Sequence, residues 1–507
     1  MKTQILIRSD ASIQMGSGHV MRSLALANAL CAKGAEITFV CREHPGQISG
    51  LIESAGHRLI RLPAPTLPSP GKLAHSHWLG VSQEEDAHLS LASLKEMGGC
   101  DWLIVDHYAL DVIWETAMRP YTKHIMVIDD LADRKHDCDL LLDQNLHADM
   151  ETRYESLVPP NCLKLLGPKY ALLRPEFSEA RKNLKKRDGS VKRILIFFGG
   201  SDPGNETGKA LEAIKLLGRT AIAVDVVVGA ANPHQEEITS FCAHLPETRL
   251  YRQINNISEL MAKADLAIGA GGGTMWERCC LGLPAIVMSV ATNQQSGCEA
   301  VASSGGILYL GEAQRVGIEL LEKALRVTLS SPGLVASMSK VGASLVDGQG
   351  GGRVAKHLMK PSIILRQAQL ADCEPIFNWR NADETRRFSI ETNPISLNEH
   401  VVWFGKALEN PDCQILIGES DGEAVGVLRF DRGEKCAVIS VYVVPGSYGK
   451  GIGVQLIEQG TSWVEHNWPE VGSIEATIVS GNAPSISAFS EAGFKKKSCT
   501  FVKQIRN

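Results

Sequence analysis

The run Ile5-Leu6-Ile7-Arg8-Ser9-Asp10, followed by Met15-Gly16-Ser17-Gly18-His19-Val20-Met21-Arg22, decides the fold expected for this chain. The apolar run predicts a buried strand, the glycine-rich segment predicts a turn, and the residues after it predict a helix. Such a strand–turn–helix junction points backbone N–H groups toward whatever lies in the turn. It also places His19 at the carboxyl end of a first strand, where open α/β sheets bind their ligands.

The same alternation of strand and helix continues through the first 145 residues. Near-continuous apolar strands are typical of a parallel sheet that is buried on both faces between helix layers. The expected strands are Gln4–Asp10, Glu36–Cys41, Arg58–Leu62, Trp102–His107 and His124–Asp130, and the expected helices are Val20–Ala32, Ile48–Ala55 and Glu85–Met97.

A second unit of the same kind follows a charged segment, Glu176–Arg187, that is expected to be helical. It begins with the strand Lys192–Phe198, which ends in Gly199-Gly200-Ser201-Asp202. Two α/β units in tandem leave a cleft between them, which is a common place for a ligand.

The pattern changes near residue 360. Three adjacent strands without intervening helices, Gln414–Glu419, Ala424–Phe430 and Cys436–Val443, indicate an antiparallel meander. The expected domains are therefore an N-terminal lobe at 1–175, a second lobe at 176–360 and a third domain at 361–507.

Composition excludes several classes of protein. The chain has 507 residues, 44% of them hydrophobic, and a net charge of −5 without a basic block, which disfavours nucleic-acid binding. Its 13 cysteines include no C-x-x-C pair, so reduced thiols are favoured over disulfides or zinc. No apolar run approaches the ~18 residues of a membrane span, and no signal peptide is visible. A cytoplasmic location is expected, and the oligomeric state stays open.

Several polar residues lie where ligands are expected. His19 suits a general base because the ordinary pKa of histidine is near neutrality, although it could equally cap the turn. Asp106-His107-Tyr108 and Asp129-Asp130 end two predicted strands. Paired carboxylates there can bind a metal or hold a base in position, but helix caps and loop salt bridges are the preferred interpretation for Asp129 and Asp130.

Gly269-Ala270-Gly271-Gly272-Gly273-Thr274 holds four glycines between a predicted strand and a predicted helix. Glycine lets the backbone approach a phosphate closely, and the helix N-terminus supplies partial positive charge. The spacing fits neither a P-loop nor a dinucleotide fingerprint. Glu277, one turn later, could accept hydrogen bonds from a ribose diol or simply interact with the helix dipole.

The third domain carries its own glycine-rich turn, Tyr448-Gly449-Lys450-Gly451-Ile452-Gly453, before a predicted helix. Successive N–H groups there can bind a pyrophosphate. A further segment that begins at Asn482 contains Phe489. Two other groups, Trp379-Arg380-Asn381 and Arg386-Arg387, could stack on a ligand and bind its acidic groups, or could simply form the end of a helix.

Five segments of this chain resemble, in sequence and in order, those of the UDP-2,4-diacetamido-2,4,6-trideoxy-β-L-altropyranose hydrolases of pseudaminic acid biosynthesis. The segments are Gly16–Arg22, Asp106-His107-Tyr108, Tyr170–Arg174, Gly271–Gly273 and Asn293-Gln294. The resemblance covers roughly residues 1–357. It implies two Rossmann-like lobes in a GT-B (MurG-like) arrangement within an α/β fold.

The resemblance also implies a reaction: water attacks the anomeric carbon of the UDP-sugar with inversion, and UDP leaves. His19 would activate the water, and the turn Gly271, Gly272 and Gly273 would stabilise charge on the pyrophosphate, for which no metal is required. The remaining implied substrate contacts are Gly18, Arg22, Tyr108, Arg174, Asn293 and Glu277, the last of these on the uridine ribose.

Residues 362–507 resemble the α+β GNAT N-acetyltransferases, and Trp379-Arg380-Asn381 with Glu399-His400 resembles the subgroup that acetylates the 4-amino group of UDP-linked amino sugars. The resemblance implies acetyl-CoA as co-substrate, bound by Val443, Tyr448, Gly449, Gly451, Gly453 and Asn482. Two positions depart from the pattern: Tyr448 replaces the usual Gln or Arg, and Phe489 stands where a tyrosine often protonates the CoA thiolate.

The product of such an acetylation would be the substrate of the hydrolase, so one chain would carry two successive steps. Three alternatives stay open: a GT-B glycosyltransferase, a UDP-sugar hydrolysing 2-epimerase, and a non-catalytic sensor of UDP-sugar and acetyl-CoA.

Overall fold

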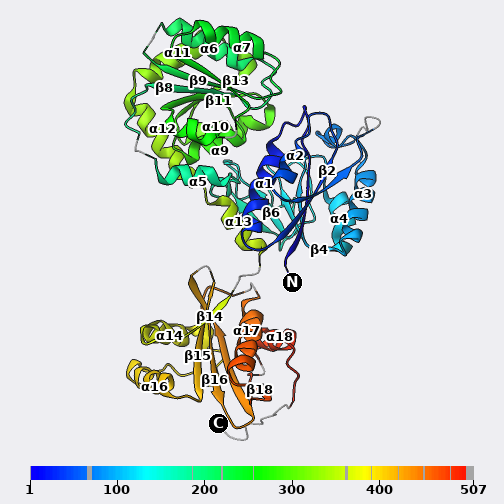
Figure 1. Cartoon of the computed structure of the whole chain (residues 1–507), viewed down its shortest axis with the longest axis vertical. Coiled ribbons are helices and arrows are strands. Elements are labelled where there is room, and N and C mark those ends of the chain that lie inside the picture. The colour runs from blue at the N-terminus through cyan, green and yellow to red at the C-terminus, as the bar shows by residue number, and fades with distance from the viewer. Residues whose placement is uncertain are drawn as a thin grey trace. The chain divides into compact units, whose positions relative to one another are not determined.

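The computed structural model describes residues 2–65, 71–184, 187–218, 221–254, 256–359, 363–389, 391–420, 422–448, 451–479 and 481–497. The backbone forms two compact units, residues 1–359 and residues 360–507 (Figure 1). The first unit contains two lobes, each with its own sheet, and the second contains one sheet.

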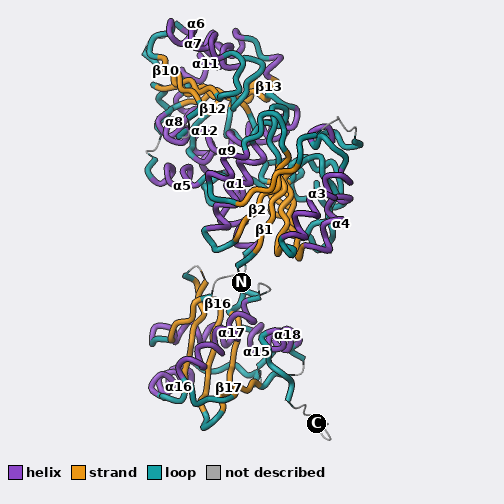
Figure 2. Tube along the Cα trace, turned by 45° about the vertical axis from the view of Figure 1, so that its right-hand side comes forward, coloured by secondary structure: helices purple, strands orange, loops and turns teal. Residues whose placement is uncertain are grey.

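The N-terminal lobe contains a parallel sheet in the order β3-β2-β1-β4-β5-β6-β7. Figure 2 labels its strands β1 and β2. The interior strand β1 buries Ile5, Leu6 and Ile7 completely, as expected for a strand covered on both faces. The described strands are β1 Gln4–Ser9, β2 Glu36–Arg42, β3 Arg58–Leu62, β4 Cys100–Asp106, β5 Thr122–Ile128, β6 Leu140–Asp143 and β7 Leu163–Leu166.

Helices cover both faces of this sheet. Helix α1 lies on one face, and α3 and α4 lie on the other (Figure 1). The strand order reverses direction between β1 and β4, where Ser9 is paired with Asp106. This is the position at which open α/β sheets bind ligands. The helices are α1 Gly18–Cys31, α2 Ser49–Ser54, α3 Gln83–Glu96 and α4 Val112–Met118.

The second lobe repeats this plan with the strand order β10-β9-β8-β11-β12-β13. Helices α6, α7 and α11 pack on one face and α8, α9 and α10 on the other. The strands are β8 Arg193–Phe197, β9 Ala223–Val228, β10 Thr248–Arg252, β11 Leu266–Ala270, β12 Ala285–Ser289 and β13 Leu308–Glu312. The helices are α5 Pro175–Lys182, α6 Glu206–Leu217, α7 Gln235–His244, α8 Ile257–Lys263, α9 Gly273–Cys280, α10 Gln295–Ser303, α11 Ile318–Leu329 and α12 Pro332–Leu345.

Several elements of the first unit differ from the sequence expectation, which did not include α4, β6, β7 or β13. Helix α5 ends at Lys182, five residues before the expected end at Arg187. Helix α13, Gly350–Leu358, was not expected, and it returns to the N-terminal lobe, where Val354, Ala355 and Leu358 join the core beside α1. The end of the second lobe therefore stabilises the first.

The second unit is a mixed sheet in the order β14-β15-β16-β17-β18. Helices α14 and α16 cover one face and α17 and α18 the other (Figure 1). Its elements are β14 Ile364–Gln367, α14 Cys373–Asn381, α15 Asp383–Arg386, α16 Leu397–Glu409, β15 Cys413–Ser420, β16 Glu423–Arg432, β17 Cys436–Val443, α17 Ile452–Asn467, β18 Ser473–Ala476 and α18 Ala483–Glu491.

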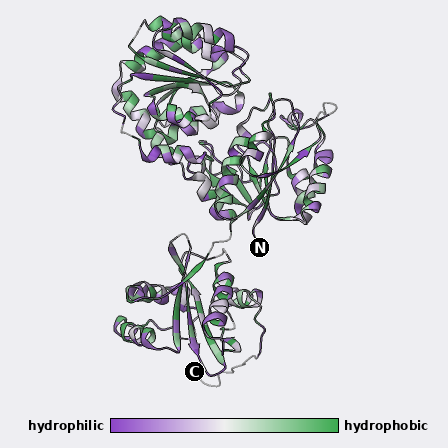
Figure 3. Ribbon diagram, viewed as in Figure 1, coloured by the Kyte–Doolittle hydropathy of each residue, from purple (hydrophilic) through white to green (hydrophobic). Residues whose placement is uncertain are grey.

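The helices mix apolar and polar residues along their length, as expected for helices that bury one face (Figure 3). Among the described residues, no helix has both the length and the apolar character that crossing a bilayer requires.

The packing of α13 against the N-terminal lobe leaves no room for a side chain at Gly350, which can be tested. A Cβ there would lie 2.3 Å from the carbonyl oxygen of Ala171, whereas a Cβ at Gly352 on the same helix would meet nothing within 4 Å. We expect Gly350→Ala to lower the free energy of unfolding by about 1–3 kcal/mol through overpacking. Gly352→Ala should leave it unchanged or raise it by up to about 1 kcal/mol. Urea denaturation followed by circular dichroism measures both, and equal effects would contradict the packing argument.

Candidate active site

His19 and Asp106 form a buried pair at the carboxyl ends of β1 and β4. Nδ1 of His19 lies 2.6 Å from Oδ1 of Asp106, and the two residues are 7% and 0% exposed. Since Asp106 is anionic, we assign the proton of the imidazole to Nδ1. Nε2 then carries the free lone pair and has no hydrogen-bond partner among the described residues. This is the state of histidine that accepts a proton.

Asp106 is held by three side chains. Arg22 donates to both carboxylate oxygens, at 2.6 and 2.8 Å, and Ser23 donates to Oδ2 at 3.0 Å. Burial alone would raise the pKa of Asp106, but the charge of Arg22 and the hydrogen bonds from Arg22 and His19 outweigh it and hold that pKa well below its usual range. Asp106 is therefore a fixed anion that orients His19.

A second carboxylate, Asp130, completes the arrangement. Its Oδ1 accepts the hydroxyl of Tyr108, and its Oδ2 lies 3.2 Å from Arg22. The ring of Tyr108 packs edge-on against His19 with 4.5 Å between centroids. Burial and Asp130 raise the pKa of Tyr108 well above its ordinary value, so the phenol stays a donor.

Of Asp129 and Asp130, which were both expected to form helix caps or loop salt bridges, only Asp129 does so. Asp129 pairs with Arg134 at 2.8 Å and accepts the backbone N–H of Ala132, as in a loop salt bridge. Asp130 instead belongs to the His19 group. His107, which lies between Asp106 and Tyr108 in sequence, accepts the N–H of Ala109 and lies 3.3 Å from Asp10.

The glycine-rich turn of the second lobe lies between β11 and α9, next to β8, at the strand-order reversal of that sheet. Gly272 has φ +77°, and a Cβ on Gly271 would meet Sγ of Cys298 at 2.5 Å, so the fold itself requires both glycines. Gly273, the first residue of α9, has neither constraint and is exposed. Among the described residues, neither a close neighbour nor a positive φ explains a glycine there.

Glu277 and Arg174 lie together. Their side chains are 3.6 Å apart, and Arg174 also contacts Glu176 at 2.9 Å. Burial raises the pKa of Glu277 to about 7, although Arg174 opposes the shift. Asn293 is exposed in the short helix Thr292–Gln294, beside Gln294, whose amide lies 3.3–3.4 Å from a Cβ built on Gly271 or Gly272.

The predicted residues of the first unit thus form three groups: His19 with Arg22 and Tyr108, the glycine turn with Asn293, and Arg174 with Glu277. Gly18 begins α1 directly before His19 and is exposed. The first two groups are connected by residues that the motifs did not indicate, because Trp276 of α9 donates to Asn145, which donates to Asp130.

The second unit has a comparable junction at the start of α17. Gly451 is the N-cap of this helix with φ +69°, and a Cβ on Gly453 would lie 3.9 Å from Val443 at the end of β17. Strands β17 and β18 pair only from Cys436 to Ile439, so Ser440–Val443 lack a β18 partner. Tyr448 is half exposed, and Gly449 lies outside the described residues.

Asn482 and Phe489 belong to α18. Asn482 caps that helix by accepting the N–H of Ser485 at 3.1 Å. Phe489 is 5% exposed and packs edge-on against Phe494, with 5.0 Å between ring centroids. Its ring is part of the core and carries no donor.

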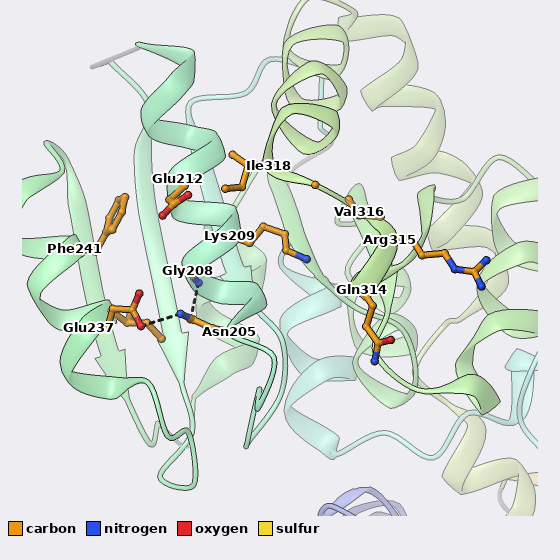
Figure 4. Close-up of a pocket in the computed structure, with 12 residues that line it drawn as sticks. Asn205, Gly208, Lys209, Glu212, Glu237, Phe241, Gln314, Arg315, Val316 and Ile318 are labelled. Carbon is orange, nitrogen blue, oxygen red and sulfur yellow. Dashed lines mark hydrogen bonds between the residues drawn. The ribbon is translucent and has the colours of Figure 1, made fainter.

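A separate pocket of about 520 Å³ lies between α6, α7 and the segment before α11 (Figure 4). None of the predicted site residues lines it. Within the described ranges, no cluster of three or more His, Cys, Asp or Glu side chains is arranged to hold a metal ion.

Comparison with known families assigns two parts of the chain. Residues 194–347 match the glycosyltransferase family 28 C-terminal domain, and residues 362–495 match the acetyltransferase (GNAT) domain. The second lobe is thus similar to the glycosyltransferase family 28 C-terminal domain, and the second unit to the GNAT acetyltransferase domain.

Two curated proteins resemble longer stretches. An uncharacterized protein of Methanocaldococcus jannaschii is 25% identical over 511 residues, covering 97% of each chain. The UDP-2,4-diacetamido-2,4,6-trideoxy-beta-L-altropyranose hydrolase of Campylobacter jejuni is 27% identical over 303 residues, covering 60% of this chain and 97% of that one. The first unit is thus a distant relative of that hydrolase.

Among solved structures, MurG of Acinetobacter baumannii superposes with a TM-score of 0.50 at 14% identity, covering 71% of this chain and 99% of that one. At this identity the likeness concerns the fold alone. It confirms the expected fold class, two parallel α/β sheets in a MurG-like GT-B arrangement followed by a GNAT-type mixed sheet.

The raised pKa of Glu277 predicts a pH-dependent stability. Above pH 7 the ionised carboxylate costs roughly 3 kcal/mol of folding free energy, and the cost disappears as pH falls toward the ordinary pKa near 4. Glu277→Gln should therefore raise the free energy of unfolding at pH 8 by up to that amount and change it little at pH 4. The matched control is Glu179→Gln, which removes an exposed ion pair with Lys182 and should change it by less than about 1 kcal/mol at both values. Equal gains at pH 4 and 8 would contradict the assignment.

Proposed function

We propose that the first unit hydrolyses a UDP-linked sugar, specifically UDP-2,4-diacetamido-2,4,6-trideoxy-β-L-altropyranose, to the free sugar and UDP. The observation that carries this proposal is the contact between Nδ1 of His19 and Asp106, which leaves Nε2 as a free base at the ligand-binding edge of the sheet. The relationship to the Campylobacter jejuni hydrolase supports the choice of substrate.

In the proposed reaction, Nε2 of His19 takes a proton from water as the water oxygen bonds to the anomeric carbon. The bond from that carbon to the phosphate oxygen breaks on the opposite face, so the configuration inverts and UDP leaves with the electron pair. Asp106 stabilises the imidazolium that forms and keeps the ring in position. Arg22 and Tyr108 hold this pair in place, and Tyr108 and Asn293 position the sugar and the water.

The start of α9 is the proposed site for the diphosphate. Its unpaired N–H groups and helix dipole favour an anion, and they stabilise the charge that develops as UDP leaves. Gly273 supports this assignment, since a ligand close to the backbone would explain a glycine that the fold does not need. The carboxylate of Glu277, whose charged form Arg174 stabilises, is proposed to accept hydrogen bonds from the ribose hydroxyls.

The second unit is proposed to acetylate the 4-amino group of the preceding UDP-amino sugar with acetyl-CoA. The amine attacks the thioester carbonyl, the C–S bond breaks, the amine loses a proton, and the CoA thiolate gains one. The start of α17 with Gly451, the unpaired edge of β17 at Val443 and the α18 cap at Asn482 are proposed to bind the co-substrate. Phe489 cannot donate a proton, so solvent or another residue protonates the thiolate.

One alternative has an observation in its favour. Residues 194–347 match a glycosyltransferase domain, so an acceptor hydroxyl rather than water could take the sugar. Both reactions release UDP, but only hydrolysis does so when the UDP-sugar is the sole substrate.

The proposal predicts the products of a simple incubation. With the UDP-4-amino sugar and acetyl-CoA, the chain should yield free diacetamido sugar and UDP, identified by NMR. Without acetyl-CoA it should yield little UDP. His19→Asn should slow UDP release by about 10²–10⁴-fold, since it removes the base, while UDP affinity measured by calorimetry stays unchanged. UDP release by this variant within tenfold of wild type, or release only with an added acceptor, would refute hydrolysis at His19.

Gly273 provides a second test. Gly273→Ala should leave the free energy of unfolding unchanged or slightly higher, because the added Cβ meets nothing within 4 Å. It should weaken UDP binding about tenfold or more, because the methyl group would occupy the space of the diphosphate. Gly333→Ala, which also adds a Cβ to open space on another helix of this lobe, is the control and should not alter affinity. Equal UDP affinities for all three proteins would remove the diphosphate from this turn.

A further inference from the structure

One hydrogen bond joins the two lobes at the level of the proposed site. The indole Nε1–H of Trp276 donates to Oδ1 of Asn145 at 2.9 Å, across 131 residues of sequence. Trp276 is the fourth residue of α9, within the first turn after Gly272, and is 1% exposed. Asn145 follows β6 of the other lobe, two residues beyond its last residue, Asp143.

The side chain of Asn145 is fixed at both ends. Its Oδ1 accepts from Trp276, and its Nδ2 donates to Oδ2 of Asp130 at 2.9 Å. Its backbone N–H donates to Oδ1 of Asp143 at 2.9 Å. A side-chain amide accepts and donates at once, whereas aspartate could not donate to Asp130 and leucine could do neither. The residue type at this position therefore matches its two partners.

Asp130 carries the connection onward to His19. It accepts the hydroxyl of Tyr108, whose ring lies 4.5 Å from that of His19, and it shares Arg22 with Asp106. The chain of contacts thus runs from the helix that starts at the glycine turn to the carboxylate that orients the base. Each step in this chain is a hydrogen bond, an ion pair or a ring contact.

We propose that Trp276 and Asn145 are positioning residues for the hydrolytic step. They hold Asp130, and through it Tyr108 and Arg22, in the arrangement that keeps His19 aligned. The same bond fixes α9, so the general base and the proposed diphosphate site are held in register although they belong to different lobes. This inference rests on the proposed function for its kinetic consequence, and on the contacts alone for its structural one.

A purely structural role makes a different prediction. Trp276 also packs in the apolar core beside Met275 and Cys279, so its loss could weaken folding without affecting turnover. The variant that separates the two roles is Trp276→Phe, because it keeps an aromatic ring in the core and removes the N–H donor. Its matched control is Trp114→Phe, which removes the indole bond to Asp86 at 3.1 Å, elsewhere in the same unit.

The kinetic test uses the full chain and the UDP-diacetamido sugar. Trp276→Phe should lower kcat about 10- to 100-fold, as expected when a base is slightly misplaced, with KM and the Kd of UDP within twofold of wild type. Trp114→Phe should leave kcat unchanged. A kcat for Trp276→Phe within twofold of wild type, in folded protein, would overturn the proposal.

A double-mutant cycle tests whether the bond itself is responsible. Asn145→Leu removes both hydrogen bonds of the side chain, so adding Trp276→Phe to it should lower kcat no further. If the two reductions instead multiply, the residues act independently and the proposal is wrong.

A spectroscopic measurement separates this inference from the proposed function. In ligand-free protein labelled with ¹⁵N-histidine, Trp276→Phe should shift the His19 ring nitrogen signals, assigned by their loss in His19→Asn, and Trp114→Phe should not. Unchanged His19 signals in Trp276→Phe would overturn the inference. If wild type releases no UDP, the proposed function fails, and this measurement still decides whether Trp276 positions His19.

Discussion

Asp106 is an anion without exposure to solvent, and the arrangement of the first unit's site follows from the need to compensate it. A buried carboxylate is costly unless charged or polar partners replace its water, and Arg22, Ser23 and His19 do so. Arg22 in turn exposes only 11% of its side chain and is compensated by a second anion, Asp130. Two carboxylates and one guanidinium leave one negative charge in the group. In the proposed reaction, the proton that His19 takes from water would neutralise this charge, with Asp106 directly beside the imidazolium.

The division of the first unit into two lobes imposes a second constraint. A base on one sheet and a diphosphate site on another act together only if their separation is fixed. Two sets of contacts contribute to this in the structure: α13 packs beside α1, and Trp276 bonds to Asn145. Only the second connects the two proposed groups. The packing of α13 holds the lobes together, and this bond aligns the two groups.

The sequence predicted those parts of the fold that depend on local pattern. Strands β1 and β11 are continuous apolar runs, and Gly271–Gly273 mark the turn after β11, so both were recognised. Strands β6 and β7 have four residues each, too few to show a period, and α13 begins with three glycines that read as a loop. The GNAT meander was recognised because its three strands follow one another without helices.

The site residues likewise divide into those that a local sequence pattern indicates and those that it does not. His19, Arg22 and Tyr108 were indicated by motifs, and the structure brings them together, but their catalytic role stays a prediction. Asp130 was assigned to a loop salt bridge because its partners, Tyr108 and Asn145, come from other strand ends. Trp276 and Asn145 have no motif at all, since a bond between residues 131 positions apart has no local signature. A tryptophan in the first turn of a helix whose glycine-rich start is proposed to bind phosphate is a weak signal, because tryptophan is usually explained by the core alone. Sequence patterns thus reveal the groups that meet a ligand, whereas the residues that hold those groups in register emerge only from the three-dimensional contacts.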